Sequence, residues 1–273
     1  MNKVEQQRAH FESVSARYFQ ARQTENHLTL KHLLWRAFLQ DKTGLFAPVV
    51  SVLEPMCGYS EGRKILRAHL ASDIRYSGFD YSQSLVEEAR SMYPTERIDC
   101  QDITQWTPDE EHDLVIVIGG LHHVPHHTER VLRSIHDALK PGGHFINFEP
   151  TQNNALLRWI RQVIYRRNPL FDEQTERAFD LPELNRLYRS AGFEPVDQMY
   201  PGLLSYVLYY NPDAFPALNL GSPATVERLF RAESRFYRGF TARKLSFATM
   251  TLLVKPEQAA GNGKAHPAAA TQS

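Results

Sequence analysis

The sequence predicts an α/β fold in which helices cover both faces of a doubly wound, mostly parallel sheet. Between residues 49 and 150, short β-branched runs alternate with helical patterns, as repeated strand–helix–strand units require. The run LVIVI at Leu114–Ile118 is apolar throughout, which suits a strand that is buried on both faces. The chain has 273 residues, of which 42% are hydrophobic and 23% are charged, so it can bury a sizeable core.

Seven strands are expected, separated by helices whose apolar residues recur every three or four positions. The predicted strands are Val49–Leu53, Arg75–Phe79, Glu96–Cys100, Leu114–Ile118, His144–Phe148, Glu194–Met199 and Leu245–Val254. The helices predicted between the first five strands are Gly62–Leu70, Ser84–Tyr93 and Glu129–Leu139.

The remaining segments are assigned to a single domain over residues 1–256. Residues 1–47 are predicted to be N-terminal helices, residues 49–150 the ligand-binding core, and residues 151–190 and 201–244 two cap segments. Residues 257–273 have little to bury and are expected to be disordered.

Both cap segments carry patterns with more than one interpretation. Asn153–Arg167 has an amphipathic pattern, which fits a helix that covers the core, a lid over a substrate, or a helix on a membrane surface. Ser222 followed by Pro223 predicts the start of a helix, because serine caps and proline suits the first turn. Tyr206, Tyr209 and Tyr210 fit either the core or an apolar pocket.

Composition narrows the classes of function. The chain has 31 basic and 31 acidic residues, so its net charge gives no case for nucleic-acid binding. No apolar stretch reaches the ~18 residues of a spanning helix, and the N-terminal residues lack the blocks of a secretory signal. Two cysteines cannot supply a disulfide framework. We therefore expect a cytoplasmic protein without stable membrane insertion.

Acidic side chains recur where the first three strands end. Glu54 follows the first strand and leads into a tight turn with Gly58, Asp80 ends the second strand, and Asp102 follows the third. Ligands in such sheets bind beyond the carboxyl ends of the strands, and an acid about 20 residues after the first turn suits a ribose diol. Three carboxylates favour a cationic adenosyl ligand over a pyrophosphate, which needs donors instead.

These motifs resemble those of class I S-adenosylmethionine (SAM)-dependent methyltransferases. The first motif of that family is matched at Glu54–Ser60, although Met56 and Ser60 stand where the family usually has glycine. Further motifs appear at Asp102-Ile103, at His112–Val124 and in the turn Lys140–Gly143. The resemblance implies a Rossmann-like sheet of seven strands with the last two antiparallel, a helical cap inserted near the C-terminal strands, and SAM as cofactor. It implies that the cofactor contacts are Glu54, Met56, Gly58, Asp80, Tyr81, Asp102, Ile103, Ile118, Gly119 and His122.

Four histidines follow the fourth strand, at positions 122, 123, 126 and 127. A zinc site is disfavoured because no cysteine or carboxylate stands at matching spacing, so no metal is predicted. A structural role stays open for His122 and His123. Imidazole titrates near neutral pH, and His123 lies further from the strand than His122, so we predict that His123 is the catalytic base.

The predicted activity is methyl transfer to a small-molecule acceptor, with O-methylation in specialised metabolism preferred. N- or C-methylation of a small or amphiphilic metabolite stays open, as do the oligomeric state and membrane-surface association. A nicotinamide-dependent oxidoreductase is disfavoured because the G-x-G-x-x-G spacing is absent. A regulatory subunit without catalysis is disfavoured because Glu54, Asp80 and Asp102 are all present.

Overall fold

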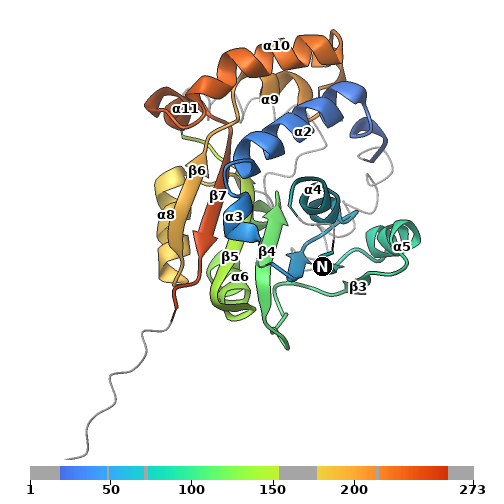
Figure 1. Cartoon of the computed structure of the whole chain (residues 1–273), viewed down its shortest axis with the longest axis vertical. Coiled ribbons are helices and arrows are strands. Elements are labelled where there is room, and N and C mark those ends of the chain that lie inside the picture. Colours follow the sequence, from blue (N-terminus) through green and yellow to red (C-terminus); the bar gives the residue numbers. More distant parts are fainter. Residues whose placement is uncertain (1–18, 48, 71–72, 154–176, 213–214, 258–273) are drawn as a thin grey trace, which may run out of the picture.

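The computed structural model describes residues 19–47, 49–70, 73–153, 177–212 and 215–257, and these form one seven-stranded sheet flanked by helices (Figure 1). The strand order is β3-β2-β1-β4-β5-β7-β6. The first five strands are parallel, and β7 is antiparallel to both of its neighbours. The predicted fold class is therefore confirmed. The strands are β1 Ser51–Pro55, β2 Arg75–Asp80, β3 Arg97–Cys100, β4 His112–Ile118, β5 Leu139–Pro150, β6 Glu194–Met199 and β7 Ala248–Val254.

The central strand β4 supplies both halves of the core, because successive side chains of a strand point to opposite faces. Leu114 and Ile116 lie in one apolar cluster, whereas Val115 and Val117 lie in the other. The first cluster is covered by α2 Glu25–Leu39, α3 Thr43–Phe46, α4 Glu61–His69, α5 Gln83–Met92, α9 Leu204–Tyr209 and α10 Pro223–Glu233. The second is covered by α6 Thr128–Asp137 and α8 Leu181–Ser190.

Two predicted boundaries differ most from those of the structure. The last strand begins at Ala248, because Phe240–Leu245 forms a separate helix, α11. Ser246 ends that helix, since its hydroxyl accepts the backbone N–H groups of Gly202 at 2.8 Å and Ala248 at 3.1 Å. The other difference is β5, which extends back to Leu139 because its pairing with β4 starts opposite His112.

The two predicted cap segments differ in the structure. From the first, α8 packs on the sheet, and Asn147 of β5 donates a hydrogen bond to the Tyr188 hydroxyl at 2.7 Å. The amphipathic pattern at Asn153–Arg167 lies, from residue 154 onward, outside the described residues, as does the predicted disordered tail from residue 258. Of the helices that the structure describes, none is both long and apolar enough to cross a bilayer.

The second cap segment packs over the N-terminal helix α2. Asn26 donates to the side-chain oxygen of Asn219 at 2.9 Å, and α10 begins after Ser222 as predicted. The three tyrosines of this segment are buried in the core, where Tyr206 and Tyr210 stack with ring centroids 4.5 Å apart. Their location answers the question that the sequence left open in favour of core packing.

Candidate active site

Three residues in the loop after β1 have a left-handed backbone conformation, which residues other than glycine rarely adopt. The φ angles are 56° at Met56, 50° at Gly58 and 59° at Ser60. A non-glycine residue pays of order 1–3 kcal/mol for a sparsely populated conformation and keeps it only where its surroundings enforce it. The loop is therefore held in a shape that it would not adopt alone.

Glu54 enforces that shape from beneath the loop. Its carboxylate accepts hydrogen bonds from Gly62 N at 2.9 Å, from Arg63 N at 3.3 Å and from the Tyr76 hydroxyl at 2.5 Å. A Cβ on Gly62 would lie 2.7 Å from the Glu54 carboxyl carbon, so only glycine permits this contact. The carboxylate thus caps the N-terminus of α4, where the helix dipole favours negative charge.

Burial is the dominant influence on Glu54. The side chain is 2% exposed, and burial raises its pKa to about 7, although the hydrogen bonds from Tyr76 and Gly62 act in the opposite direction. Since both oxygens are bonded to protein donors, the structure places Glu54 under the loop that would receive a ligand.

Asp80 links the end of β2 to the same loop. Its two oxygens accept Gly58 N and Ser82 N, each at 3.0 Å. Burial raises the pKa of Asp80, while these two hydrogen bonds lower it. A Cβ built on Gly58 would meet no heavy atom within 4 Å, so the loop faces open space at the position where a ligand is expected. This cradle, with an acid beside it, fits an adenosyl ligand.

The segment after β3 supplies the next strand-end acid. Asp102 lies two residues beyond Cys100, the last residue of β3, and one of its oxygens accepts both the N–H and the hydroxyl of Thr104 at 2.8 Å. Ile103 is buried in the same apolar cluster as Phe79 and Trp106. Tyr81 directly follows Asp80 at the end of β2. Asp80, Tyr81, Asp102 and Ile103 therefore lie at the ends of adjacent strands, as predicted.

The loop after β4 comes close to the loop after β1. Gly119, which follows Ile118, has φ 63° and donates its N–H to Phe148 O at 2.7 Å. A Cβ on Gly120 would lie 2.9 Å from the sulfur of Met56, so the two loops touch at a glycine. His122 and His123 then form a short 3-10 turn in which their ring centroids are 3.9 Å apart.

Glu149, near the end of β5, holds this loop, and the sequence analysis missed it. Its carboxylate accepts Gly120 N at 3.0 Å, Leu121 N at 2.8 Å and His122 N at 3.3 Å. The His122 Nδ1 atom lies 2.9 Å from the same carboxylate. The signal available in the sequence was an acid ending an apolar run, FINFEP, the same pattern that identified Glu54.

The carboxyl of Glu149 is fully enclosed at 1% exposure, and burial raises its pKa to about 7. The hydrogen bond from Leu121 and the charge of His123 lower that pKa in part. His123 also lowers the pKa of Asp80, so its imidazole lies close enough to interact with both carboxyls. Within the described residues, no group of three or more His, Cys, Asp or Glu is placed to hold a metal ion.

A buried ion pair, also missed from sequence, joins α2 to the start of α4. Lys31 of α2 pairs with Glu61, the first residue of α4, and Lys31 is 8% exposed. Burial acts to raise the pKa of Glu61, but the charge and hydrogen bond of Lys31, together with the charges of Arg22 and His27, outweigh it and leave the pKa lowered. The pair fixes the N-terminal helix against the loop that Glu54 supports.

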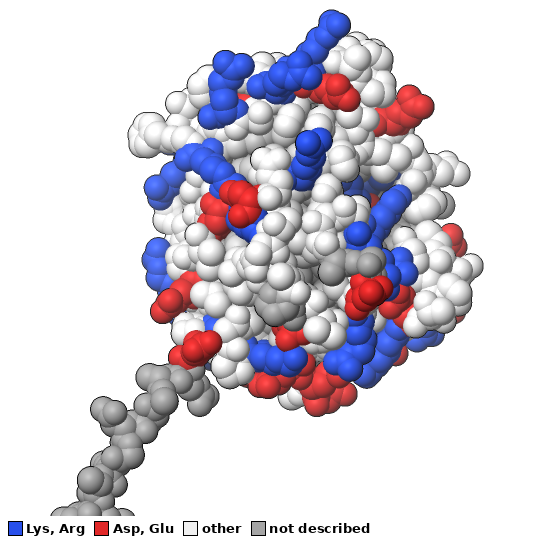
Figure 2. Space-filling view, in the orientation of Figure 1, with Lys and Arg blue, Asp and Glu red and all other residues white. Residues whose placement is uncertain are grey.

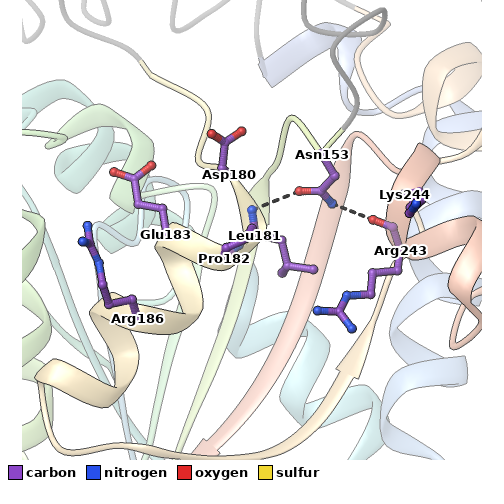
Figure 3. Close-up of a pocket in the computed structure, with 8 residues that line it drawn as sticks. All are labelled: Asn153, Asp180, Leu181, Pro182, Glu183, Arg186, Arg243 and Lys244. Carbon is purple, nitrogen blue, oxygen red and sulfur yellow. Dashed lines mark hydrogen bonds between the residues drawn. The ribbon is translucent and has the colours of Figure 1, made fainter.

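A cavity of about 670 Å³ lies at the same edge of the sheet, beyond β5 (Figure 3). Asn153 spans its rim, since its side chain accepts Leu181 N at 3.0 Å and donates to Arg243 O at 2.9 Å. Glu183 and Arg186 come from α8 on one side, and Arg243 and Lys244 from α11 on the other.

A backbone hydrogen bond links the histidine loop to the segment that forms one wall of the cavity. Arg177 N donates to His122 O at 3.1 Å, three residues before Asp180, which lines the cavity. The lining combines three basic side chains with two acidic ones, and Leu181 is its buried apolar member.

Comparisons with known proteins agree with this geometry. A family model described as a methyltransferase domain matches residues 52–143, the segment from β1 to the turn before the extended part of β5. A demethylmenaquinone methyltransferase of Listeria welshimeri is 23% identical over 168 residues, which cover 54% of this chain and 71% of the relative. A trans-aconitate 2-methyltransferase of Variovorax paradoxus is 31% identical over 93 residues, or 34% of this chain and 35% of the relative.

Solved structures show the same fold. The methyltransferase in a complex with the Trm112 methyltransferase activator of Haloferax volcanii aligns with a TM-score of 0.58 and 19% identity, covering 92% of this chain and 98% of its own. The matched domain spans the first three strand-end acids, the glycine cradle after β1 and the histidines after β4. Together, the matched domain, the relatives and the fold support a class I SAM-dependent methyltransferase with SAM as its cofactor.

Proposed function

We propose that the chain transfers the methyl group of SAM to an oxygen of a small-molecule acceptor. Residues 49–150 are the SAM-binding core in this proposal, and the segments beyond β5 shape the acceptor side. Bound SAM supplies an electrophilic methyl group on a sulfonium. The chain's own task is to align the acceptor in line with that methyl group and to exclude water, and such positioning contributes roughly 7–11 kcal/mol in favourable systems.

The cofactor would be held mainly by strand-end residues. Asp80 would accept hydrogen bonds from the ribose diol, and Gly58 and Gly119 would let the backbone approach closely. Asp102 and Ile103 would contact the adenine side, and Met56, Tyr81, Ile118 and His122 would complete the pocket. We assign Glu54 a positioning role, because the residue is 2% exposed and its carboxylate accepts three hydrogen bonds, from Gly62 N, Arg63 N and the Tyr76 hydroxyl.

The observation that carries the proposal of O-methylation is the pair of histidines held against Glu149. A hydroxyl acceptor must lose a proton during transfer, and a histidine is suited to accept it. His123 would be the base, while Glu149 would act through His122 by fixing the loop and orienting its ring. Glu149 and His122 are then positioning residues for this step.

The cavity beyond β5 is the proposed acceptor site. Its basic side chains Arg186, Arg243 and Lys244 would favour an acceptor that carries an anionic group, and Leu181 supplies an apolar wall. The names of the relatives designate demethylmenaquinone and trans-aconitate as acceptors, which supports the small-molecule class. The alternative is N- or C-methylation of a small or amphiphilic metabolite.

The decisive experiment is mass spectrometry of metabolites from cells with and without the gene, grown on methyl-deuterated methionine. A product about three mass units heavier than its unlabelled form, from three hydrogens replaced by deuterium, would identify the acceptor, and its carbon NMR spectrum would show which atom carries the new methyl group. A methyl carbon bonded to oxygen supports the proposal, and one bonded to nitrogen or carbon contradicts it.

A further inference from the structure

The helix α11 and the turn before it expose large apolar side chains. Phe240 is 71% exposed, Phe236 is 52% exposed and Leu245 is 43% exposed. Burying such a side chain typically stabilises a protein by about 1.5–3 kcal/mol, so leaving three of them in water within ten residues is costly. We call these three residues, together with Arg235, Arg243 and Lys244, the α11 patch.

The surroundings of the patch are basic, although the chain as a whole is neutral. Residues 222–245 contain six basic side chains and two acidic ones, against 31 of each sign in the full sequence. One of the two acids, Glu233, is turned inward, where its carboxylate accepts Ser205 N and the Ser205 hydroxyl. Figure 2 shows more Lys and Arg than Asp and Glu side chains over the end of the molecule that α10 forms.

The patch is held outward by contacts to the body of the protein. Arg238, which lies between the two phenylalanines in sequence, forms ion pairs with Asp197 of β6 and with Asp41. Tyr237 is buried and its N–H donates to Ser234 O, which closes the turn. With the turn anchored on both sides of Phe236, the exposed rings cannot fold back without breaking these bonds.

Cations and rings alternate in a way that suits an interface between water and hydrocarbon. The Lys244 ammonium lies 4.5 Å from the centre of the Phe240 ring. In such an arrangement the ring can enter an apolar layer while the ammonium stays at the polar boundary. Phosphate groups of a nucleic acid would pair with the basic side chains, but they would leave Leu245 and the edges of both phenylalanine rings in water.

We propose that the α11 patch docks the enzyme on an anionic phospholipid surface. Anionic headgroups attract the basic side chains of this segment other than Arg238, which is paired with Asp197 and Asp41, at about 1 kcal/mol for each charge near the surface, and the rings insert between the headgroups. Arg243 and Lys244 also line the cavity beyond β5, so docking would turn the rim of that cavity toward the lipid. Lipid docking stands independently of which atom the enzyme methylates.

The test is co-sedimentation of the full chain with unilamellar vesicles of phosphatidylcholine alone, or of phosphatidylcholine mixed with one-third phosphatidylglycerol. We expect binding to the anionic vesicles at low salt, at least tenfold weaker binding to the neutral ones, and loss of most binding at 0.5 M NaCl because salt screens surface charge.

Two double variants separate the apolar and the charged contributions. Phe236→Ser with Phe240→Ser should weaken binding to anionic vesicles at least tenfold, and Arg231→Gln with Arg235→Gln should weaken it about tenfold. The matched controls are Leu45→Ser on α3 and Arg189→Gln on α8, which change exposed residues elsewhere and should bind as the wild type does. All four proteins should keep their circular dichroism spectrum and their affinity for SAM.

Three results would overturn the proposal. The first is equal or no binding of the wild type to both kinds of vesicle. The second is a wild type that is dimeric by light scattering and becomes monomeric in the phenylalanine variant, since the patch would then be an interface between copies. The third is binding of a single-stranded oligonucleotide that the arginine variant loses, with no binding to lipid. Turnover of a water-soluble acceptor is a separate readout, so a failure here leaves the methylation proposal untouched.

Discussion

Glu54 and Glu149 lie near the ends of β1 and β5, and each holds one of the two loops of the site. Both are buried, both accept backbone N–H groups, and burial raises the pKa of each to about 7. Their remaining partners differ. Glu54 receives the Tyr76 hydroxyl, which is neutral near physiological pH, whereas Glu149 faces the imidazole of His122.

This difference in partners indicates that Glu54 fixes the conformation of its loop, whereas Glu149 also interacts with an ionisable side chain. Glu54 caps the N-terminus of α4 and so keeps the cofactor loop in its left-handed conformation. Glu149 keeps the histidine loop in place in the same way, but its ionisable carboxyl also lies 2.9 Å from the His122 imidazole. We therefore expect substitutions around Glu54 to affect the cofactor and substitutions around Glu149 to affect turnover.

The largest effect is expected from the loop that Glu149 holds. His123→Ala should lower kcat by about 10²–10⁴-fold if His123 removes the acceptor proton, with little change in SAM affinity. Steady-state kinetics and calorimetry with SAM measure the two quantities, and the pH–rate profile should lose the limb that reflects the base. His126→Ala, an exposed histidine of the same segment, is the control and should keep wild-type turnover. A variant at position 123 with a normal rate and profile would remove the base role.

On the cofactor side, Asp80→Ala should weaken SAM binding by about 2–3 kcal/mol, because charge-assisted hydrogen bonds to the ribose would be lost. Calorimetry gives the affinity directly, and circular dichroism checks that the fold survives. Asp99→Ala, on the exposed part of β3, should leave the affinity unchanged. Equal affinity in the two variants would argue against a ribose contact at Asp80.

A pair of isosteric variants compares the two glutamates directly. Glu149→Gln should lower kcat about tenfold and shift the pH–rate profile, because His122 loses the ionisable carboxyl beside it. Glu54→Gln should leave the profile in place and weaken SAM binding instead. If the two variants change the same parameter to the same extent, the division between the two loops is wrong. Recovery of the rate in Glu149→Asp would indicate that an ionisable carboxyl at this position is what the reaction requires.

The smallest effect is a difference in the pH dependence of stability. A carboxyl whose folded pKa is about 7 and whose unfolded pKa is near 4.5 binds its proton more tightly when folded, so its contribution to stability is complete below about pH 4.5 and is lost as the pH rises to 7. Buried histidines oppose this trend, since burial lowers the pKa of His27 to about 3. The comparison is therefore made between wild type and variant.

Urea unfolding from pH 5 to 7.5 measures this difference. The free energy of unfolding of the wild type should fall relative to that of Glu54→Gln by about 1 kcal/mol per pH unit, and Glu149→Gln should show the same slope. A constant difference across the range would mean that the carboxyl titrates at the same pH in both states.

Local sequence determined the part of the site that follows the first three strands. Glu54, Asp80 and Asp102 could be placed because each stands within two residues of the end of a run of strand-forming residues, and parallel strands bring such ends to one edge. The start of α10 at Ser222 was likewise predictable, since capping depends on neighbouring residues alone. These features are encoded within a few positions of where they act.

Tertiary structure alone decided the roles of Glu149, Lys31 and α11. Glu149 meets Gly120 across 29 positions of sequence, and only the pairing of β5 beside β4 brings them together. Lys31 is charged in the midst of an apolar helical pattern, and its burial depends on Glu61 arriving from α4. Phe240 has a large apolar side chain of the kind that usually lies in a core. It is exposed because the turn anchored by Arg238 directs it outward. The chemistry of a hydrophobic or charged side chain determines which kinds of group it can contact. Only the packing of distant segments decides whether it contacts another part of the protein, a ligand or a surface outside the molecule.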